Sequence, residues 1–499
     1  MREEATLLPE RSRAATVPGI VWIAAAVLAC LAVFILNGRP LFYFDTGGYV
    51  AQGRVALTQL GWAEPPAVPS AGGAGGAGDM AGAGTVDGSR SAVYALVAGV
   101  LSRLGFLEGL IALHIAAVLL TVWIAARAVL RGTGAALPPV VAVPVIAACL
   151  GALPFYTAYL MPDTLAAVMI LALSVLAAYG RTLRPWETVL LIAIAGFAVV
   201  SHLSHLAIAA LMVPVALVVS PVLSLRRWWL PPLLVLLVVG VGYGERQALR
   251  VAARAVAGSE VVIKPYITAR LIQDGPGWAW LERHCPDPAI ATCALHEALT
   301  KSDDPMRFTA SHIVFQTSPE LGSFRRLPPE DQNRVARAQM DFFKAVLTEA
   351  PLATTLAFVR NMLIQTTMFS VDMTLPSASI VEGAKAVPGS AFGLEAGRLT
   401  ADTGYLAWLT PLQALVYGVS LLAVAMLVVR PGRLSPAMRA LALAVIAGIL
   451  ANALVCGGIS QPATRYGARV IWLLPLIATL LAMAAARGAG RVAEGAGRA

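Results

Sequence analysis

Charged side chains are scarce in this sequence. Only 13% of its 499 residues are Asp, Glu, Lys or Arg, whereas 58% are hydrophobic, and a soluble protein of this length could not cover its surface with so few charges. Apolar runs near the roughly 17 to 25 residues needed to cross a bilayer recur along the chain. Because backbone groups inside a bilayer must be satisfied within one segment, these runs predict helices. We expect an all-α polytopic membrane protein.

Acidic residues are outnumbered by basic ones. The chain has 28 Asp and Glu against 37 Lys and Arg, a net charge of +9. In a soluble domain this excess would favour a nucleic-acid partner. Here Lys and Arg mostly flank apolar runs, as the positive-inside rule predicts for cytoplasmic loops, so we expect contacts with membrane lipids and none with nucleic acid.

Cysteine is also sparse, with five in the chain and no zinc-ligand spacing. Cys285 and Cys293 fall in the polar stretch "HCPDPAIATC", close enough to form a disulfide if that stretch faces an oxidising compartment. Free thiols, or a metal site with the neighbouring histidines, are the alternatives. The other cysteines lie in or beside apolar runs and are predicted to be small buried hydrophobic residues: Cys30, Cys149 and Cys456.

The first apolar run, residues 17–36, is followed by no Ala-x-Ala cleavage site, so it is predicted to be retained as a membrane span. The chain also shows no internal sequence repeat, whereas many transporters are built from such repeats. Ten spans of about 20 residues follow from the apolar runs: 18–37, 108–130, 138–155, 163–180, 186–203, 206–223, 228–248, 404–429, 437–456 and 468–487.

This set of spans places the arginine clusters on one side of the membrane, which the positive-inside rule assigns to the cytoplasm together with both termini. Two apolar stretches, 92–104 and 352–369, are left out of the count and are predicted to be helices lying in the membrane interface. The first is short, and the second carries Arg360, Asn361 and Gln365. If 352–369 crossed the membrane, every later segment would change sides.

The resulting organisation has five parts along the chain. Residues 18–248 form a transmembrane core with a first outer loop at 38–107, which includes a low-complexity Gly/Ala stretch at 70–89 that is unlikely to pack. A mostly helical extracytoplasmic segment then precedes the last spans. The parts are a cytoplasmic N-terminus at 1–17, the core at 18–248, the extracytoplasmic segment at 249–403, the C-terminal spans at 404–487 and a cytoplasmic tail at 488–499.

The stretch "LFYFDTGGYV" puts a carboxylate, Asp45, at the outer mouth of the first span. A carboxylate at this depth is partly removed from water, which makes it a better base or ligand. Gly47 and Gly48 allow a close backbone approach, and Tyr49 suits a membrane interface. The alternative is that Asp45 only caps a helix.

A second carboxylate, Asp163 in "MPDTLA", begins the fourth span on the same side. Asp before a long apolar run, with Pro162 just ahead of it, is typical of a helix N-cap. The functional alternative depends on Asp45 and Asp163 lying at the same membrane depth.

Two further motifs lie at the outer ends of spans. "SHLSH" places His202 and His205 on one helical face, where they would bind a ligand or anchor the helix in the interface. "TRYGAR" places Arg465, Tyr466 and Arg469 at the entrance of the last span. Cations are unusual on the outer side, and paired guanidiniums suit phosphate oxygens; anchoring to lipid headgroups is the alternative.

These features together resemble the GT-C superfamily of membrane glycosyltransferases. The shared layout is a span, a long outer loop with an Asp and a following Tyr, a juxtamembrane helix with a Tyr near its start, a span ending in Arg, and a second outer acid. The residues that take these places are Asp45, Tyr49, Tyr94, Arg127 and Asp163.

The resemblance implies an enzyme that uses a polyprenyl-phosphate-linked sugar on the outer face of the inner membrane. It would make Asp45 the base that deprotonates the acceptor, and Asp163 a residue that positions the acceptor or a metal. Thr46 stands where an acidic residue often follows the first Asp, so metal dependence stays open and a divalent cation is one alternative. The donor sugar and the glycan, lipid or protein acceptor are not indicated.

The sequence therefore favours a membrane glycosyltransferase acting outside the cytoplasm. A transporter or flippase is the second hypothesis, and it predicts ionisable residues in the middle of spans. A non-enzymatic scaffold whose extracytoplasmic segment binds a partner is the third, and it would make Asp45 dispensable.

Overall fold

The computed structural model describes residues 18–62, 85–131, 136–223, 227–258, 260–318 and 320–496. The predicted cytoplasmic N-terminus at 1–17, most of the Gly/Ala-rich stretch and the last three residues of the predicted tail lie outside the described residues.

Each of the ten predicted spans coincides with a helix or a helix pair, which confirms the all-α polytopic class. The third predicted span, 138–155, is interrupted near position 150, and the last two spans have a π-helix and a short helix at one end. The elements are α1 (Gly19–Asn37), α4 (Gly109–Val129), α5 (Leu137–Cys149), α6 (Leu153–Thr157), α7 (Thr164–Tyr179), α8 (Pro185–Val200), α9 (Leu203–Leu223), α10 (Leu230–Ala257), α19 (Leu406–Val429), α20 (Pro436–Ala453), the π-helix η4 (Leu454–Ser460), α21 (Thr464–Ile471) and α22 (Leu473–Ala496).

Helix length separates these spans into two groups. Among the described residues, six helical segments are long and apolar enough to cross a bilayer, or seven if the bent pair α15 (Pro329–Glu349) and α16 (Pro351–Thr367) is one span. The 16-residue helix α7 is one of the shorter apolar helices, and at about 1.5 Å per residue it is shorter than a bilayer core. Every residue of α7 is buried, so its length is matched to its protein neighbours and not to lipid.

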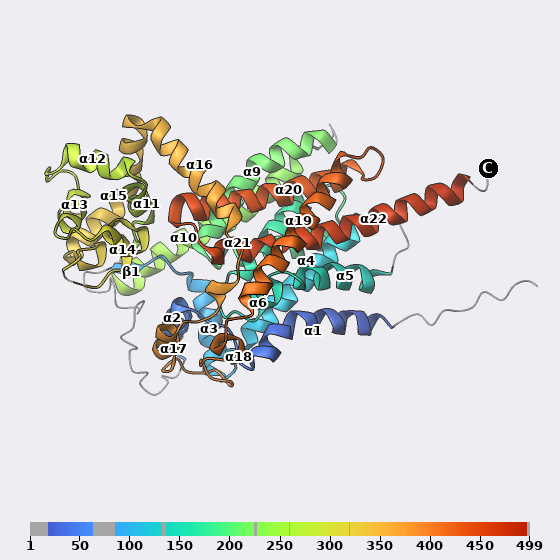
Figure 1. Ribbon diagram of the computed structural model, residues 1–499, viewed down its shortest axis with the longest axis horizontal. Helices are drawn as coiled ribbons and strands as arrows, with labels where there is room; N and C mark the ends of the chain where they lie inside the picture. Colours follow the sequence, from blue (N-terminus) through green and yellow to red (C-terminus); the bar gives the residue numbers. More distant parts are fainter. Residues whose placement is uncertain are drawn as a thin grey trace, which may run out of the picture.

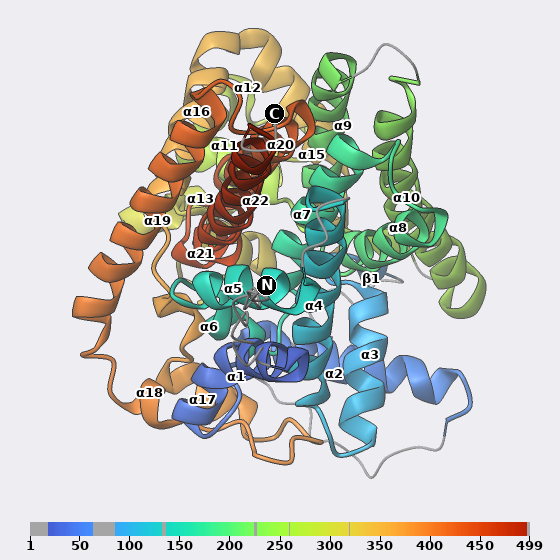
Figure 2. The same ribbon diagram turned by 90° about the vertical axis from the view of Figure 1, so that its right-hand side faces the viewer.

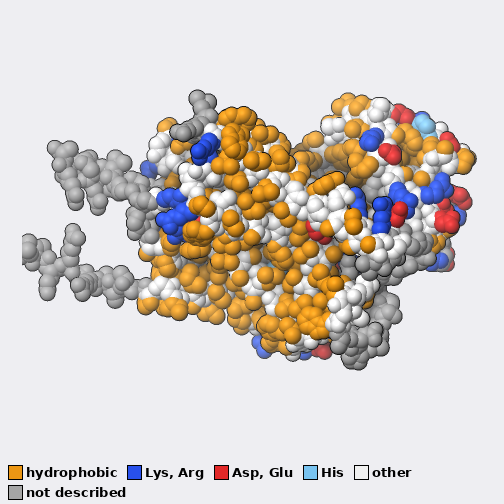
Figure 3. Space-filling view, turned by 180° about the vertical axis from the view of Figure 1, so that it is seen from behind, with side chains coloured by type: hydrophobic (Ala, Val, Ile, Leu, Met, Phe, Trp, Pro, Cys, Tyr) orange, Lys and Arg blue, Asp and Glu red, His pale blue; other side chains and the backbone are white. Residues whose placement is uncertain are grey.

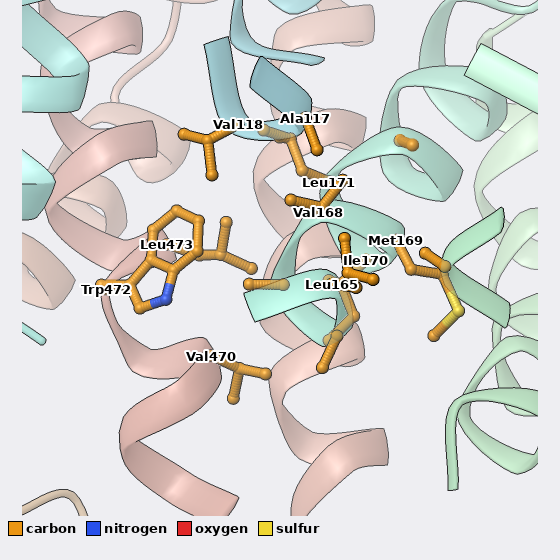
Figure 4. Close-up of a cluster of buried hydrophobic side chains, with 14 of the residues drawn as sticks. Ala117, Val118, Leu165, Val168, Met169, Ile170, Leu171, Val470, Trp472 and Leu473 are labelled. Atoms are coloured by element: carbon orange, nitrogen blue, oxygen red, sulfur yellow. The ribbon is translucent and has the colours of Figure 1, made fainter. Parts of the chain in front are cut away.

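Helix α7 forms the centre of the bundle. It packs against α4, α8, α9, α10 and α20, and Figure 2 shows it enclosed among them. Its side chains share one buried hydrophobic cluster with Val118 of α4, Val470 of α21 and Leu473 of α22 (Figure 4). The aliphatic residues on all sides of α7 follow from this enclosed position.

The flank of the bundle is covered by apolar side chains, and charged residues gather at its two ends (Figure 3). Large hydrophobic residues on α1, α10 and α19 are exposed there, as expected for surfaces that face lipid. The described chain begins at α1 and ends in α22 on the same side of the molecule (Figure 1). We call this side the arginine end, because Arg127, Arg131, Arg181 and Arg433 lie at the helix ends there, and the opposite side the α2 end.

At the α2 end, two helices of the predicted outer loop cross closely. Helices α2 (Phe44–Gln59) and α3 (Ala92–Arg103) pack against each other, and a Cβ on Gly99 would lie 2.6 Å from the carbonyl carbon of Gly53. Only glycine fits this crossing. Three short elements follow in the chain: η3 (Asp372–Thr374), which packs on α21, α17 (Ala378–Ala384), which packs on α2, and α18 (Arg398–Ala401), which packs on α1.

The α2 end also carries a small helical unit with its own hydrophobic core, in the predicted extracytoplasmic segment (Figure 1). The chain links Cys285 and Cys293 there by a disulfide. A parallel strand pair, β1 (Thr85–Asp87) and β2 (Glu260–Val262), joins the unit to the first loop. The helices of the unit are α11 (Tyr266–Asp274), α12 (Pro276–His284), α13 (Cys293–Thr300), η1 (Pro305–Phe308), α14 (Ala310–Phe315), η2 (Phe324–Arg326) and α15 (Pro329–Glu349).

Helix α16 (Pro351–Thr367) links this unit to the bundle and corresponds to the predicted interfacial helix at 352–369. It is bent by 113° from α15. Its buried side packs on η4, α20 and α21, where the Gln365 amide bonds to both the N–H and the carbonyl of Ala463 at 2.9 Å. Asn361 and Gln365 of this stretch are buried and therefore serve packing at the α2 end; its position in the membrane interface stays a prediction.

Candidate active site

A backbone contact brings the two predicted acidic loops together. Leu41, before α2, donates to the carbonyl of Ala158 at 2.9 Å, and the N–H of Leu160 donates to the carbonyl of Leu41 at 2.8 Å. Leu41 and Tyr159 form a parallel bridge. Thr46 adds a contact from its hydroxyl to the sulfur of Met161 at 3.3 Å. These contacts set the starts of α2 and α7 side by side at the α2 end.

Asp45 lies in the first turn of α2, one residue inside it, and does not cap it. The N-cap residue is Tyr43, whose N–H donates to the Thr46 hydroxyl at 3.0 Å. The Asp45 carboxylate accepts instead from Arg90, from Nε at 3.2 Å and Nη2 at 3.1 Å. The side chain remains 38% exposed. The helix-cap interpretation of Asp45 is therefore wrong, and the expected lone carboxylate has a cationic partner.

Arg90 owes its place to Gly48. A Cβ on Gly48 would come within 2.8 Å of the Arg90 guanidinium carbon, so glycine lets this side chain lie flat on α2. Ser91 then caps α3 by accepting from the N–H of Tyr94 at 3.0 Å, and its hydroxyl donates to the carbonyl of Val200 at 2.6 Å. The second glycine after Asp45 therefore makes room for Arg90, the partner of the Asp45 carboxylate.

Asp163 precedes α7 and is completely buried. Its carboxylate makes no cap hydrogen bond; it accepts from Arg465 through a two-pronged contact, Nε to Oδ1 at 3.0 Å and Nη2 to Oδ2 at 2.7 Å. A guanidinium matches a carboxylate best in this geometry. The interpretation of Asp163 as only a helix cap is therefore wrong.

Arg465 connects the two acids. While its Nε and Nη2 hold Asp163, its Nη1 lies 4.0 Å from Oδ2 of Asp45. The side chain is 5% exposed, and its guanidinium lies over the ring of Tyr43, 4.6 Å from the centroid. Tyr43, Tyr159 and Tyr466 surround this cation and stabilise it in a desolvated position.

Arg469 lies one helical turn further along the chain and is completely buried. Its Nε and Nη2 donate to the side-chain oxygen of Asn452 at 3.1 and 2.9 Å, and Nη2 reaches the hydroxyl of Ser204 at 3.1 Å. Its Nη1 is 3.5 Å from Asp163. Arg469 therefore supports Asp163 from behind and has no accessible edge for a ligand.

The two predicted histidines lie beside this network. Their ring centroids are 5.2 Å apart. Nδ1 of His202 contacts the Ser204 hydroxyl at 2.8 Å, whereas Nδ1 of His205 lies 2.7 Å from the carbonyl oxygen of Ala198. His205 thus faces the backbone of α8, and only His202 is linked to the arginine cluster, through Ser204.

Tyr49 and Tyr94 form an aromatic wall behind Asp45. Their rings meet edge to face with centroids 5.1 Å apart. Burial, and then the nearby Asp45 carboxylate, raise the pKa of Tyr49 well above its ordinary value, so the phenol stays neutral. Burial also raises the pKa of Tyr43, against an opposing effect of Arg465. The phenols of Tyr43 and Tyr49 are therefore not suited to accept a proton near neutral pH.

Arg127, which the family layout pointed to, lies far from this cluster. Its Nε donates to Glu187 at 2.9 Å at the arginine end, where Arg131 pairs with the same carboxylate at 2.6 Å. Arg127 therefore links α4 to α8 and takes no part in the candidate site.

The site residues do not form a metal site. No group of three or more His, Cys, Asp and Glu side chains suited to a metal ion occurs within the described ranges. Asp45 and Asp163 both face guanidiniums, which repel a divalent cation.

Among the described side chains of the cluster, guanidiniums outnumber carboxylates. Arg90, Arg465 and Arg469 contribute three guanidiniums and Asp45 and Asp163 two carboxylates. An anion that binds next to Asp45 would meet the guanidiniums of Arg90 and Arg465. The geometry thus offers a partly exposed proton acceptor beside two guanidiniums.

Comparison with known proteins gives little. No family model matches the sequence, and no curated protein matches it. Among solved structures, the chain is similar to ArnT from Cupriavidus metallidurans, whose crystal structure is described as bound to undecaprenyl phosphate; the match covers 96% of this chain and 78% of that one, with 15% sequence identity and a TM-score of 0.35.

Proposed function

We propose that this protein is a membrane glycosyltransferase that moves a sugar from a polyprenyl-phosphate donor to an acceptor hydroxyl at the α2 end. Such a transfer needs a base for the acceptor and cations for the leaving phosphate. The observation that carries the proposal is the exposed carboxylate of Asp45 with one guanidinium on each side of it, Arg90 at 3.1 Å and Arg465 at 4.0 Å.

The transfer takes place in one displacement at the anomeric carbon. The acceptor oxygen attacks the anomeric carbon of the sugar and loses its proton to Asp45. The bond from that carbon to the phosphate oxygen breaks, and its electron pair stays on the phosphate. Arg465 and Arg90 stabilise the negative charge that develops there, while Arg469 and Asp163 hold Arg465 in place.

A lipid-linked donor suits the surroundings of Asp45. Phe44, its neighbour, is exposed, and so are Val55, Leu60 and Trp62 further along or just beyond α2. A prenyl chain would lie against this apolar surface while its phosphate reaches the guanidiniums. Exposed aromatic and aliphatic residues next to a polar centre are typical of sites at a membrane interface.

The charge distribution favours an extracytoplasmic position for the site. Arg127, Arg131, Arg181 and Arg433 mark the opposite end of the bundle, and the positive-inside rule places arginine-rich loop ends in the cytoplasm. The α2 end, with its disulfide between Cys285 and Cys293, then faces an oxidising compartment.

A flippase is the second candidate, and the position of the charges argues against it. Asp163 precedes α7, Asp45 begins α2, and Arg465 is near the start of α21. A transport path instead requires ionisable groups that follow one another through the middle of the spans.

The experiment offers purified protein in nanodiscs a panel of synthetic polyprenyl-phosphate monosaccharides. We expect one donor to be consumed, with release of polyprenyl phosphate and of free or transferred sugar. Free sugar is included because water serves as a poor acceptor when the true acceptor is absent. The same panel is tested for movement across proteoliposomes. Translocation of an intact donor, with none of the panel cleaved, would overturn the proposal in favour of the flippase.

A further inference from the structure

A cavity lies at the edge of the small helical unit, beside the bend of 113° between α15 and α16. It has a volume of about 460 Å³, and three ionisable side chains line it: Asp274, Arg283 and Arg360. None of the lining residues belongs to the candidate active site. We propose that this cavity binds the phosphate of an anionic membrane lipid.

Arg360 of α16 is the lining cation that is held most loosely. Its Nη2 lies 3.5 Å from Oδ1 of Asp274, and its side chain is 64% exposed. Both oxygens of Asp274 already accept from nearer donors, because Arg270 contacts each of them and Asn361 donates to Oδ2 at 2.8 Å. The guanidinium of Arg360 therefore stands at the cavity wall with room to bind a further anion.

Positive charge exceeds negative charge in the ion pairs around the cavity. Arg283 of α12 pairs with Glu349 at the end of α15, and Asp274 is shared by Arg270 and Arg360. In these described pairs, three guanidiniums thus meet two carboxylates. Guanidiniums are the side chains best shaped to bind phosphate oxygens, so the cavity favours a phosphate over a cation.

The starts of two helices add backbone donors to the same cavity. Gly275 and Pro276 at the start of α12, and Ala350 and Ala353 at the start of α16, are lining residues. Neither helix has a side-chain hydrogen bond at its N-cap. The first N–H groups of a helix have no partner inside it and lie at the positive end of its dipole. An anion in the cavity would lie near both helix starts as well as the guanidiniums.

The surface beside the cavity is apolar, which favours a lipid as the source of the phosphate. Leu356 lines the cavity and is exposed, and so are Leu352, Val359 and Leu363 of the same helix. Their spacing of four, three and four residues puts them on one face of α16. Acyl chains would lie along this face while the phosphate meets the guanidiniums, as in helices that bind anionic lipids at a membrane surface.

Helix α16 runs from this cavity to the bundle (Figure 1), and its far end reaches the candidate active site. Gln365 bonds to the backbone of Ala463, two residues before Arg465. A lipid that holds α12 and α16 together would thus support the helix that contacts the backbone next to Arg465. The test below measures lipid binding and not sugar transfer, so its outcome is independent of the proposed function.

The experiment compares Arg360→Gln with the control Arg334→Gln on α15. Arg334 is 54% exposed, pairs with Asp331 at 3.3 Å and lies outside the cavity lining, so the control removes the same charge from the same unit. Native mass spectrometry of protein released from nanodiscs of phosphatidylcholine with a small share of phosphatidylglycerol measures the enrichment of retained phosphatidylglycerol. Thermal unfolding with inorganic phosphate against chloride, at equal ionic strength, measures binding of the free anion.

Ala353→Glu keeps the test valid if the loss of Arg360 disturbs the fold. Ala353 is exposed and is the third residue of α16, a position where Glu favours a helix start. The added carboxylate should therefore leave the unfolding midpoint unchanged or raise it, but it would repel an anion in the cavity.

We expect Arg360→Gln to lower the enrichment of phosphatidylglycerol roughly tenfold, Ala353→Glu to lower it at least as much, and Arg334→Gln to retain it. Equal enrichment in the unaltered protein and all three variants would overturn the proposal. No enrichment in the unaltered protein, or stabilisation by inorganic phosphate without enrichment of the lipid, would overturn it as well.

Discussion

Arg465 and Asp163 are 302 residues apart in the chain, yet the guanidinium of one holds both carboxylate oxygens of the other, at 3.0 and 2.7 Å, inside the helix bundle. This pair joins the start of α7 to the start of α21, and Asp45 stands at its exposed side, 4.0 Å from the same guanidinium. The two acids have different positions. Asp163 holds the guanidinium of Arg465 in place, and the carboxylate of Asp45 faces the surface.

Arg465→Lys is expected to destabilise the protein although it conserves the charge. An ammonium group cannot bridge both oxygens of Asp163 and also approach Asp45, so the buried carboxylate is left partly unsatisfied at a cost of about 1 to 3 kcal/mol. The midpoint of thermal unfolding in detergent measures this loss.

Arg39→Lys is the matched control for that change. Arg39 pairs with Glu395 at 2.7 Å, but both side chains are substantially exposed, so the same substitution should alter stability by less than about 1 kcal/mol. Equal midpoints for the Arg465 and Arg39 variants would show that the two-pronged contact is unimportant.

Asp163→Asn should be the most damaging change to stability at the site. It leaves Arg465 and Arg469 buried without their carboxylate, a loss of roughly 3 to 5 kcal/mol for an unpaired buried charge. The double variant Asp163→Asn/Arg465→Gln should lose less stability than the sum of the losses of the two single variants, because the pair is removed as a unit. Strict additivity in this double-mutant cycle would contradict the proposed pairing.

Gly53→Ala is expected to displace α3 from α2. The added Cβ would overlap the carbonyl oxygen of Ala95, and the backbones would have to separate, which moves Arg90 away from Asp45. Gly418→Ala in α19 serves as the control, since nothing lies within 4 Å of its Cβ position. Donor consumption should fall at least tenfold in the first variant and stay unchanged in the second; the reverse order would refute the role of this helix crossing.

The disulfide between Cys285 and Cys293 can be tested together with the orientation of the chain. The two residues are eight apart, and in the chain-entropy model closing so short a loop stabilises the unit by about 2 to 3 kcal/mol. Peptide mapping without reductant should recover the linked peptide from protein made in intact cells. Alkylation of both thiols in the native, unreduced protein would place this unit in a reducing compartment and contradict the extracytoplasmic site.

The apolar runs predicted a helix at each of the ten positions, because lipid imposes a strong compositional demand on a helix. Only six or seven helical segments of the described chain are long and apolar enough to cross a bilayer. The runs also predicted that Asp45, Asp163 and Arg465 lie at the same end, since side alternates with each crossing. The runs could not show that Asp163 and Arg465 are partners. That pairing depends on the Leu41 to Tyr159 bridge and on the packing of α21 against α7, which leave no trace in hydropathy.

The sequence pattern does not single out three polar residues of the site, Arg90, Asn452 and Ser204. Arg90 follows a Gly/Ala-rich stretch in an ordinary loop sequence, and the only local hint was Ser91, a good N-cap for the helix that follows it. Asn452 and Ser204 look like single polar residues at the ends of apolar runs. Their role follows from Arg469, since a buried guanidinium needs acceptors on every side, and only the fold identifies which side chains supply them.

The central claim, that Asp45 is the catalytic base, is tested most directly by Asp45→Asn. Asn keeps the size of the side chain and an oxygen for Arg90, and because Asp45 is 38% exposed its loss of charge should change stability by no more than about 1 kcal/mol. Consumption of the polyprenyl-phosphate sugar accepted by the unaltered protein is then measured in nanodiscs, with folding checked by the unfolding midpoint. We predict a fall of about 10²- to 10⁴-fold in rate at an unchanged midpoint; full activity of the Asn variant would contradict the assignment.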